Sequence, residues 1–342
     1  MKGQLVVSLD FELFWGMLDC STLEEYGDNV LTGKSAIPRL LELFRKYGIH
    51  ATWATVGFLF GEDYEDLRQY FPEEKLRPSY SDQRLDAYGQ FENIGNNEKE
   101  APCFYGPSLI RMVAETPGQE IGSHTFCHYY CREKGQTVAQ FEADIRAAKA
   151  IAAAKGYDLT SVVLPRNQCE PEYTEVLRKC GFTAYRDEEN DWIHKKIRIR
   201  PLMRLLRLMD AYLPLTGQGG YIPASEDGIW NLTGSRAFKA VSHSRHMLEG
   251  LKVRRIKKQM LHAAKEGLTF HLWWHPHNMG GLTEEFFTQL EDVLQYYTQL
   301  KETYGMESRN MREAAADAAQ RRHQVAEKYG LQPRQNETEE NF

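Results

Sequence analysis

Two acids and two histidines of this 342-residue chain have the types and the spacing that metal chemistry requires. Asp10 and Glu12 follow the apolar run QLVVSL, and His124 and His128 lie four residues apart in GSHTFCHYYC. A buried carboxylate is costly unless it is paired or bound to a metal. Two histidines with one carboxylate form the ligand set of catalytic zinc hydrolases and of non-haem iron oxygenases. The residues therefore predict that one acid binds a metal and that the other accepts a proton from water.

Other readings of the histidine pair remain open. In a helical turn, His124 and His128 would lie on one face, but two unrelated histidines could share this spacing. Cys127 and Cys131 suggest a structural zinc knuckle instead. In a helix, His124 and Cys131 would be separated by about 10 Å of rise, which is too far for all four side chains to bind one ion. A knuckle would need two further ligands from elsewhere in the chain.

The elements that must position these residues alternate between strands and helices. Helical patterns ending at glycine are expected at 36–47, 138–155 and 171–180, and another ends near Lys265. Six further segments carry the apolar, β-branched and aromatic residues typical of strands: QLVVSLD, HATWATVG, QEIGSHT, SVVLPRN, FTAYRD and LTFHLWWHP. This alternation predicts a parallel α/β architecture, either a barrel or an open sheet.

The residues that could do chemistry follow these predicted strands. Parallel α/β folds build their active sites at the carboxyl ends of their strands. The candidates at these ends are Asp10, Glu12, His124, His128, Arg166, His275 and His277. We therefore expect these side chains to gather at one edge of the sheet.

Charge is unevenly distributed along the chain, whose formal net charge is -6. Residues 194–214 hold six Lys or Arg against one Asp, and residues 236–258 hold eight against one Glu. Such a basic surface suits phosphates or an anionic membrane, although a solvated charged face is the alternative. We expect no nucleic-acid partner. No export signal or membrane-spanning run is evident, so we expect a cytoplasmic protein with free cysteines.

The segments SLDFE, SHTFCH, PRN and WWHPH occur in this order, and with them the chain resembles the NodB-like polysaccharide deacetylases, carbohydrate esterase family four and its intracellular relatives. The resemblance covers roughly Lys2 to Leu300. It implies a distorted (β/α)7-type barrel over residues 1–305. Within this range, the length and weak periodicity of 61–107 predict an inserted lid or binding loop, and 194–265 form a basic segment. An exposed, charged helical tail that is partly disordered is expected at 306–342.

The resemblance also implies a reaction, which is metal-dependent hydrolysis of an N-acetyl group on an amino sugar or of a related amide. By position, Asp10 resembles the catalytic base and His275 the general acid, while Arg166 resembles the arginine that orients the base. His124 and His128 match the metal-binding histidines, and Trp192 matches an aromatic wall of the acetyl pocket. The implied cofactor is a divalent metal, zinc first, with cobalt, manganese, nickel or iron as alternatives.

The chain departs from the family pattern at two motifs. Phe11 stands where the family has a second aspartate, and Glu12 follows it. Glu12 is thus the expected metal ligand, but alternation along a strand puts Asp10 and Glu12 on the same side, so their roles could be exchanged or both could bind. In the third motif, Pro165 precedes Arg166, whereas the family has the arginine first.

Substrate expectations follow from the cytoplasmic prediction. A nucleotide-linked or lipid-linked amino sugar in surface-glycan assembly fits better than mature cell-wall polymer. Residues 195–213 favour peripheral contact with an anionic membrane at its inner face. In a helix, the apolar side chains Leu202, Leu205, Leu206 and Met209 would lie opposite the basic side chains Arg200, Arg204 and Arg207. Hydrolysis of a non-sugar amide, such as a ureide or formyl-amine, and a metal-free glycan-binding barrel are the alternatives.

Overall fold

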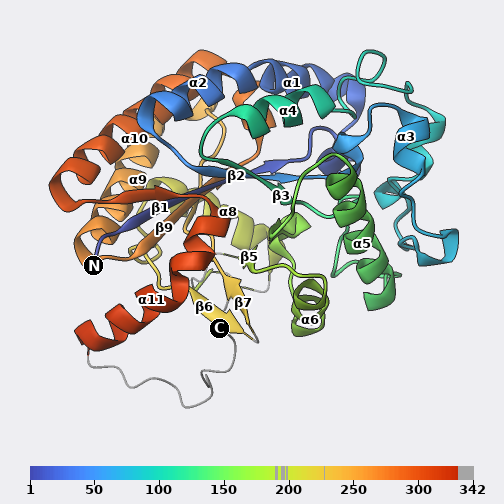
Figure 1. Cartoon of the computed structure of the whole chain (residues 1–342). Helices are drawn as coiled ribbons and strands as arrows, with labels where there is room; N and C mark the ends of the chain where they lie inside the picture. The colour runs from blue at the N-terminus through green and yellow to red at the C-terminus, as the bar shows by residue number, and fades with distance from the viewer. Residues whose placement is uncertain (189–191, 194–196, 198, 227, 330–342) are drawn as a thin grey trace.

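The computed structural model describes residues 1–188, 192–193, 197, 199–226 and 228–329, and a ten-stranded sheet forms its centre (Figure 1). The strands lie in the order β6-β7-β5-β4-β3-β2-β1-β9-β8, and β10 pairs with the first half of β1. Neighbouring strands are parallel, except β6 and β7. The strands are β1 (Gln4–Phe11), β2 (Ala51–Thr55), β3 (Gln119–Ser123), β4 (Ser161–Val163), β5 (Ala184–Arg186), β6 (Ala224–Glu226), β7 (Ile229–Asn231), β8 (Arg236–Ala237), β9 (Thr269–Trp274) and β10 (Glu307–Arg309).

Helices cover this sheet and connect its strands (Figure 1). They are α1 (Leu23–Ser35), α2 (Ile37–Tyr47), α3 (Tyr64–Arg68), α4 (Pro107–Glu115), α5 (Val138–Ala154), α6 (Pro171–Lys179), α8 (Arg200–Tyr212), α9 (His246–Glu266), α10 (Thr283–Tyr304) and α11 (Met311–Tyr329). The predicted glycine stops are confirmed where α2 ends at Gly48 and α9 at Gly267, both in the left-handed conformation. An antiparallel bridge between Tyr221 and Thr269 brings the chain before β6 back to β9. The mostly parallel α/β sheet matches the predicted distorted barrel.

Alternation along β1 gives the sheet two different faces. Leu5, Val7, Leu9 and Phe11 point outward into the main hydrophobic core, which α2 and α10 help to build. The side chains between them, from Val6 through Ser8 to Asp10, lie on the opposite face, which we call the inner face. A strand with a two-residue period can thus bury apolar side chains on one face while it presents polar ones on the other.

The start of the predicted tail is part of the folded interior. Met311 and Ala314 of α11 are fully buried, and they pack with Val6 and Ala54 on the inner face. This segment was expected to be an exposed charged helix, and it is a helix, but one whose apolar side covers the sheet. The end at 330–342, expected to be disordered, lies outside the described residues.

The insertion at 61–107 is built from α3 and short single turns. Its residues surround a hollow of about 640 Å³, and its walls include Phe71, Tyr88, Phe91 and Asp86. The role of this segment as a lid or binding loop stays a prediction. Among the helices that the structure describes, none combines the length and the apolar composition of a membrane span.

Candidate active site and metal centre

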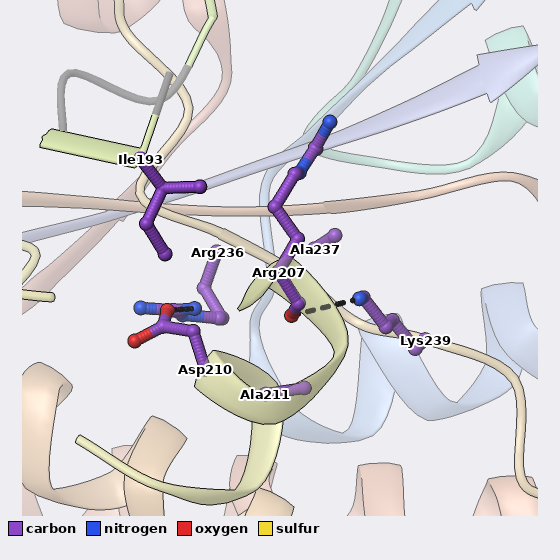
Figure 2. Close-up of a pocket in the computed structure, with 7 residues that line it drawn as sticks. All are labelled: Ile193, Arg207, Asp210, Ala211, Arg236, Ala237 and Lys239. Carbon is purple, nitrogen blue, oxygen red and sulfur yellow. Dashed lines mark hydrogen bonds and ion pairs between the residues drawn. The ribbon is translucent and has the colours of Figure 1, made fainter. Parts of the chain in front are cut away.

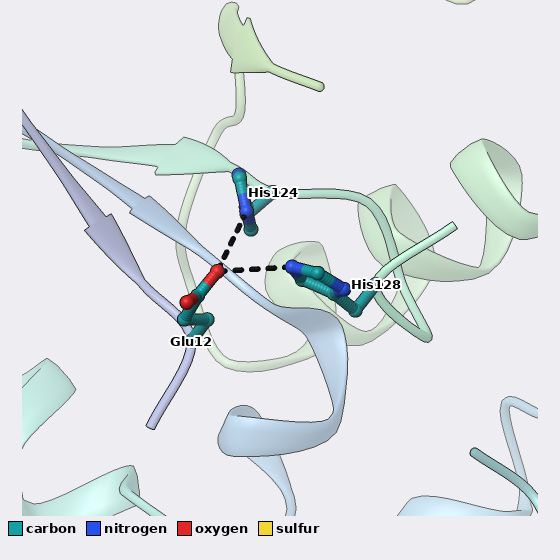
Figure 3. A group of neighbouring side chains, drawn as sticks. All are labelled: Glu12, His124 and His128. Atoms are coloured by element: carbon teal, nitrogen blue, oxygen red, sulfur yellow. Dashed lines mark hydrogen bonds and ion pairs between the residues drawn. The ribbon is translucent and has the colours of Figure 1, made fainter. Parts of the chain in front are cut away.

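Glu12 lies between two pairs of histidines just beyond the end of β1. Its Oε2 atom accepts a hydrogen bond from His128 Nε2 at 2.9 Å and lies 3.2 Å from His124 Nε2 (Figure 3). The donor atoms of these three side chains all lie within 4.8 Å of one another, and all three are buried. Within the described part of the chain, this is the group of histidine, cysteine and acidic side chains that could hold a metal ion.

The two histidines reach Glu12 from a loop and not from the helical turn considered above. Residues 124–130 have no helical assignment, and Thr125 and His128 adopt positive φ angles of 64° and 61°. Residues other than glycine seldom occupy this left-handed region, and such strained positions cluster at functional sites. The loop therefore turns sharply enough to aim both imidazoles at one carboxylate.

Contacts from two other segments hold this loop in place. Asp144 of α5 accepts hydrogen bonds from the backbone N–H groups of Phe126 and Cys127, at 2.6 and 3.0 Å. Gly57 donates its N–H to the Thr125 carbonyl, and a Cβ at Gly57 would lie 2.4 Å from the Phe126 ring. Cys127 and Cys131 are buried in the hydrophobic core. Neither cysteine joins the metal-ligating group, so the zinc-knuckle alternative has no support here.

The charge around Glu12 fits a divalent cation. Burial alone would raise the pKa of Glu12, but His275, His124 and His128 outweigh it and hold that pKa well below its usual value. Burial also lowers the pKa of His128, which favours the neutral imidazole that binds metals. His124 Nε2 faces the Glu12 carboxylate at 3.2 Å, and His124 Nδ1 is buried without a hydrogen-bond partner in the described structure. A carboxylate that faces two buried imidazoles is a suitable donor set for zinc.

Asp10 is held by an arginine other than the predicted one. Arg186, at the end of β5, places its two Nη atoms 2.7 Å from the two carboxylate oxygens of Asp10. Burial by itself raises the pKa of Asp10, but the Arg186 guanidinium, with help from His275, lowers that pKa below its usual value. Asp10 is therefore an ionised, fixed carboxylate, in the state that a general base requires.

Arg166 lies at the rim of the same region, but the structure does not pair it with Asp10. Its guanidinium pairs with Asp19 and Glu133, at 2.5 and 2.7 Å, and stacks over the Tyr130 ring. Tyr130 in turn packs edge-on against His128, with ring centroids 4.9 Å apart. The structure therefore does not bring Arg166 to Asp10, and among the described side chains it is Arg186 that makes the bidentate contact with this acid.

A buried network supports Arg186 from below. Its Nη1 donates to Ser8 Oγ at 2.8 Å, and its Nε donates to Asn167 Oδ1 at 3.0 Å. Ser8 Oγ lies 2.7 Å from His271 Nε2, and His271 Nδ1 lies 2.9 Å from the Leu232 carbonyl. Because that carbonyl can only accept, Nδ1 carries the proton and Nε2 accepts from Ser8. The guanidinium is thus fixed on three sides.

His275 and His277 complete the site from the end of β9. His275 Nε2 lies 3.5 Å from Asp10 Oδ2 and 3.7 Å from Glu12 Oε1, and its side chain is 29% exposed. His277 stacks on His275 with ring centroids 4.9 Å apart and is buried. Burial, then the neighbouring His275, lowers the pKa of His277 to about 4. His275 is therefore the histidine that both solvent and the carboxylates can reach.

Gly16 makes room for the Glu12 carboxylate. A Cβ atom at this position would lie 2.2 Å from Glu12 Cδ and 2.2 Å from Glu12 Oε1. No side chain can occupy that space unless the carboxylate moves. Trp192 is 40% exposed and donates its indole N–H to the Leu215 carbonyl, and its role as an acetyl-pocket wall stays a prediction.

Sequence reasoning missed Arg186, Ser8, His271 and Gly16. Ser8 and His271 share the inner face with Asp10. The two-residue period of the strands could have predicted this, because alternate side chains of a strand point to the same face. Arg186 also lies near the end of a predicted strand, FTAYRD. The family resemblance pointed instead to the arginine of the PRN segment, Arg166. Gly16 carried no local signal, since its neighbour Glu12 constrains it only in the folded chain.

Comparison with known proteins identifies this fold. Residues 25–185 match the family model described as polysaccharide deacetylase. The matched range contains His124 and His128 but begins after Asp10 and Glu12, so the places of these two acids rest on the geometry. No match was found among curated proteins.

Solved structures with low sequence identity share the fold. One is a protein of Mycobacterium smegmatis assigned as a polysaccharide deacetylase, with a TM-score of 0.60, 14% identity and coverage of 100% of this chain and 96% of that one. A probable polysaccharide deacetylase of Pseudomonas aeruginosa PAO1 has a TM-score of 0.56 at 13% identity, with 94% and 91% covered. The Puue allantoinase has a TM-score of 0.55 at 12% identity, with 94% and 90% covered. At this identity the likeness shows the fold alone.

Proposed function

Because residues 25–185 match the polysaccharide deacetylase family model, we propose that this chain is a metal-dependent hydrolase that removes an N-acetyl or similar acyl group from an amino sugar. Glu12, His124 and His128 are the residues proposed to hold the metal, and zinc is the proposed ion because the donor set is one carboxylate and two imidazoles. When bound, this ion would polarise the amide carbonyl and lower the pKa of a water molecule.

The side chains around this centre divide the proton transfers. Asp10 accepts the proton of the attacking water, and Arg186 holds the carboxylate so that one oxygen stays aimed at the site. His275 donates a proton to the leaving nitrogen, because it is the partly exposed imidazole beside both acids. General acid and general base steps typically contribute about 10²-fold to 10⁴-fold each. Arg186 is a positioning residue in this scheme.

The observation that carries the proposal is the separation of the two acids into different surroundings. Glu12 faces His124 and His128, whereas Asp10 faces Arg186. A carboxylate neutralised by an arginine contributes little attraction to a cation, and one beside neutral imidazoles contributes much more. Glu12 is therefore proposed as the ligand and Asp10 as the base.

For the substrate, we infer a sugar that is linked to a nucleotide or a lipid and belongs to surface-polysaccharide or lipid-linked glycan assembly. The proposed location is the cytoplasm, with peripheral contact at the inner face of the membrane. The exposed apolar side chains of α8 support a membrane-borne substrate, because they lie on a chain segment rich in arginine.

Acetate release tests the proposal. The purified zinc-loaded protein would be incubated with an N-acetylglucosamine oligomer, a nucleotide-linked N-acetyl sugar, a polyprenyl-linked N-acetyl sugar and allantoin. Acetate from any sugar, lost in Asp10→Asn with metal retained, supports the proposal. Hydrolysis of allantoin alone would instead establish the non-sugar amide alternative, and no hydrolysis with bound sugar would favour a glycan-binding barrel.

A further inference from the structure

The apolar face of α8 points away from the protein. Leu202, Leu205, Met209 and Leu213 follow one another at three- and four-residue spacing and are 40%, 53%, 40% and 45% exposed. Residues at this spacing form one stripe along a helix. An amphipathic helix usually buries such a stripe against its own domain, so this orientation needs a reason.

The buried side of α8 is fixed to the sheet by ion pairs. Asp210 is buried and pairs with Arg236 at the start of β8 and with Arg255 of α9, at 2.5 and 2.7 Å. Figure 2 shows Asp210 directed at Arg236, and Lys239 Nζ directed at the Arg207 carbonyl, 3.3 Å away. Rotation of the helix to bury its apolar stripe would remove Asp210 from both guanidinium groups, which would be costly in a buried site. The outward apolar face is therefore built into the fold.

The beginning of α9 adds a second apolar stripe beside the first. Met247, Leu248 and Leu251 are 95%, 41% and 39% exposed and lie on one side of this helix. Tyr212 at the end of α8 donates to Glu249 Oε1 at 3.3 Å, and Arg245 Nε donates to Tyr212, so the two helices meet here. We call these seven side chains the α8–α9 surface: Leu202, Leu205, Met209, Leu213, Met247, Leu248 and Leu251. Exposed apolar groups gathered in this way mark an interaction site.

Exposed basic side chains continue the α8–α9 surface along α9. Arg254 and Lys258 are both exposed. They lie on the same side of α9 as Met247 and Leu251, in the turns that follow. Of the three acids of these helices, Asp210 and Glu249 are buried and each already pairs with a basic side chain, while Glu266 lies at the far end of α9. Of the arginines predicted to oppose the apolar stripe, Arg207 is half-buried, and the side chains of Arg200 and Arg204 lie outside the described residues.

We propose that the α8–α9 surface docks on an anionic lipid membrane, with the apolar stripes entering the headgroup region and Arg254 and Lys258 facing lipid phosphates. Apolar area together with basic side chains is what interfacial helices use to bind anionic bilayers. A second copy of the chain is a poorer occupant, because a symmetric dimer through this surface would bring the same basic side chains together.

This surface lies at the end of the sheet that carries the active site. β8 runs parallel to β9, and Phe238 follows β8 as His275 follows β9. Residues 239–245 then lead directly into α9, so the start of α9 belongs to the same rim. Docking would thus present the site to a sugar carried on a lipid. This use of the surface rests on the proposed function, whereas membrane binding itself does not.

Vesicle co-sedimentation tests the docking. The full chain would be mixed with phosphatidylcholine vesicles, alone or with phosphatidylglycerol, at low and high salt. We expect the chain to bind the anionic vesicles and high salt to weaken this binding. In the double variant Leu205→Asp, Met247→Asp, the affinity for these vesicles should fall by tenfold or more. The double variant Arg254→Gln, Lys258→Gln should weaken binding by about tenfold. Met112→Asp on α4, which replaces an apolar side chain that is 39% exposed elsewhere, is the matched control and should bind normally.

Several outcomes would overturn the docking. Absence of binding to anionic vesicles, or equal binding by the Leu205→Asp, Met247→Asp variant, would do so. The docking would also be overturned if light scattering showed that the wild type is a dimer that does not bind vesicles and that this variant is a monomer. Hydrolysis of a soluble N-acetyl sugar by the same variants is measured in parallel. Normal hydrolysis with lost vesicle binding supports docking, and failure of hydrolysis in the wild type would bear on the proposed function alone.

Discussion

Arg186 grips Asp10 with both Nη atoms, each 2.7 Å from a different carboxylate oxygen, although the two residues are 176 positions apart in the chain. The guanidinium also stacks over the Trp273 ring, 4.3 Å from its centroid. Planar bidentate contact of this kind fixes direction as well as charge. The proposed base of the site therefore depends on an arginine that lies outside every motif by which the chain resembles deacetylases.

Replacement of Arg186 by lysine should reduce turnover much more than the same replacement of Arg166. Lysine keeps the charge but not the planar fork, so Asp10 should lose its fixed direction and kcat should fall by about 10²-fold. Arg166→Lys is the matched control and should retain more than about a tenth of wild-type kcat. Steady-state kinetics with metal content measured in both variants checks this. A larger kcat loss in Arg166→Lys would return the orienting role to Arg166.

The two acids should respond differently to neutral substitution. Glu12→Gln should lose most of the bound divalent ion, because the amide lacks the negative charge that faces His124 and His128. Asp10→Asn should keep the ion and lose about 10²-fold to 10⁴-fold in kcat. Elemental analysis after dialysis, with unfolding curves as a check on folding, measures this. Metal loss in Asp10→Asn with retention in Glu12→Gln would mean that the roles are exchanged.

Gly16→Ala should impair the metal centre without touching a ligand. The new Cβ would lie 2.2 Å from the Glu12 carboxylate, which must swing away from His124 and His128. We expect metal affinity to fall by at least about tenfold, as when other supporting groups of a metal site are changed. Gly217→Ala is the control, because a Cβ there meets nothing within 4 Å. Equal affinities measured by zinc titration would show that Glu12 needs no such space.

His271 should make stability depend on pH. Burial, then the charge of Arg186, lowers the pKa of His271 to about 3, whereas in the unfolded chain it is about 6.5. Between these values the unfolded chain alone binds the proton, so the free energy of unfolding falls as pH falls, by about 1.4 kcal/mol per pH unit. Denaturant unfolding between about pH 4.5 and 6.5 should show a shallower dependence in His271→Gln. Parallel dependences would exclude this contribution.

Met311→Ala should show how far α11 belongs to the core. Met311 is fully buried against the inner face, so we expect a loss of about 2–5 kcal/mol in the free energy of unfolding. Met247→Ala, at a side chain that is 95% exposed, should change that free energy by less than about 0.5 kcal/mol. Guanidinium unfolding curves compare the two. If both substitutions changed the free energy of unfolding by similarly small amounts, α11 would be a solvated tail and not part of the core.

Much of the fold follows from local sequence pattern. All six predicted strands occur, as β1, β2, β3, β4, β5 and β9, because runs of apolar and β-branched residues suit buried parallel strands. The short strands β6, β7, β8 and β10 were not predicted, since two or three residues carry too little periodicity. The burial of α11 was also not predicted. Its sequence is rich in charged residues, which is typical of an exposed helix, and its few apolar side chains are buried only because the folded sheet lies against them.

For the site, the sequence determined which residues could act, and the tertiary structure decided which of them meet. The types and strand-end positions of Glu12, His124 and His128 predicted a metal centre, and the folded chain brings them together. It also joined Asp10 to Arg186 and turned Arg166 toward Asp19. Pairing of this kind depends on strand order and on left-handed turns in the connecting loops, which are set by long-range packing and leave no mark in local spacing.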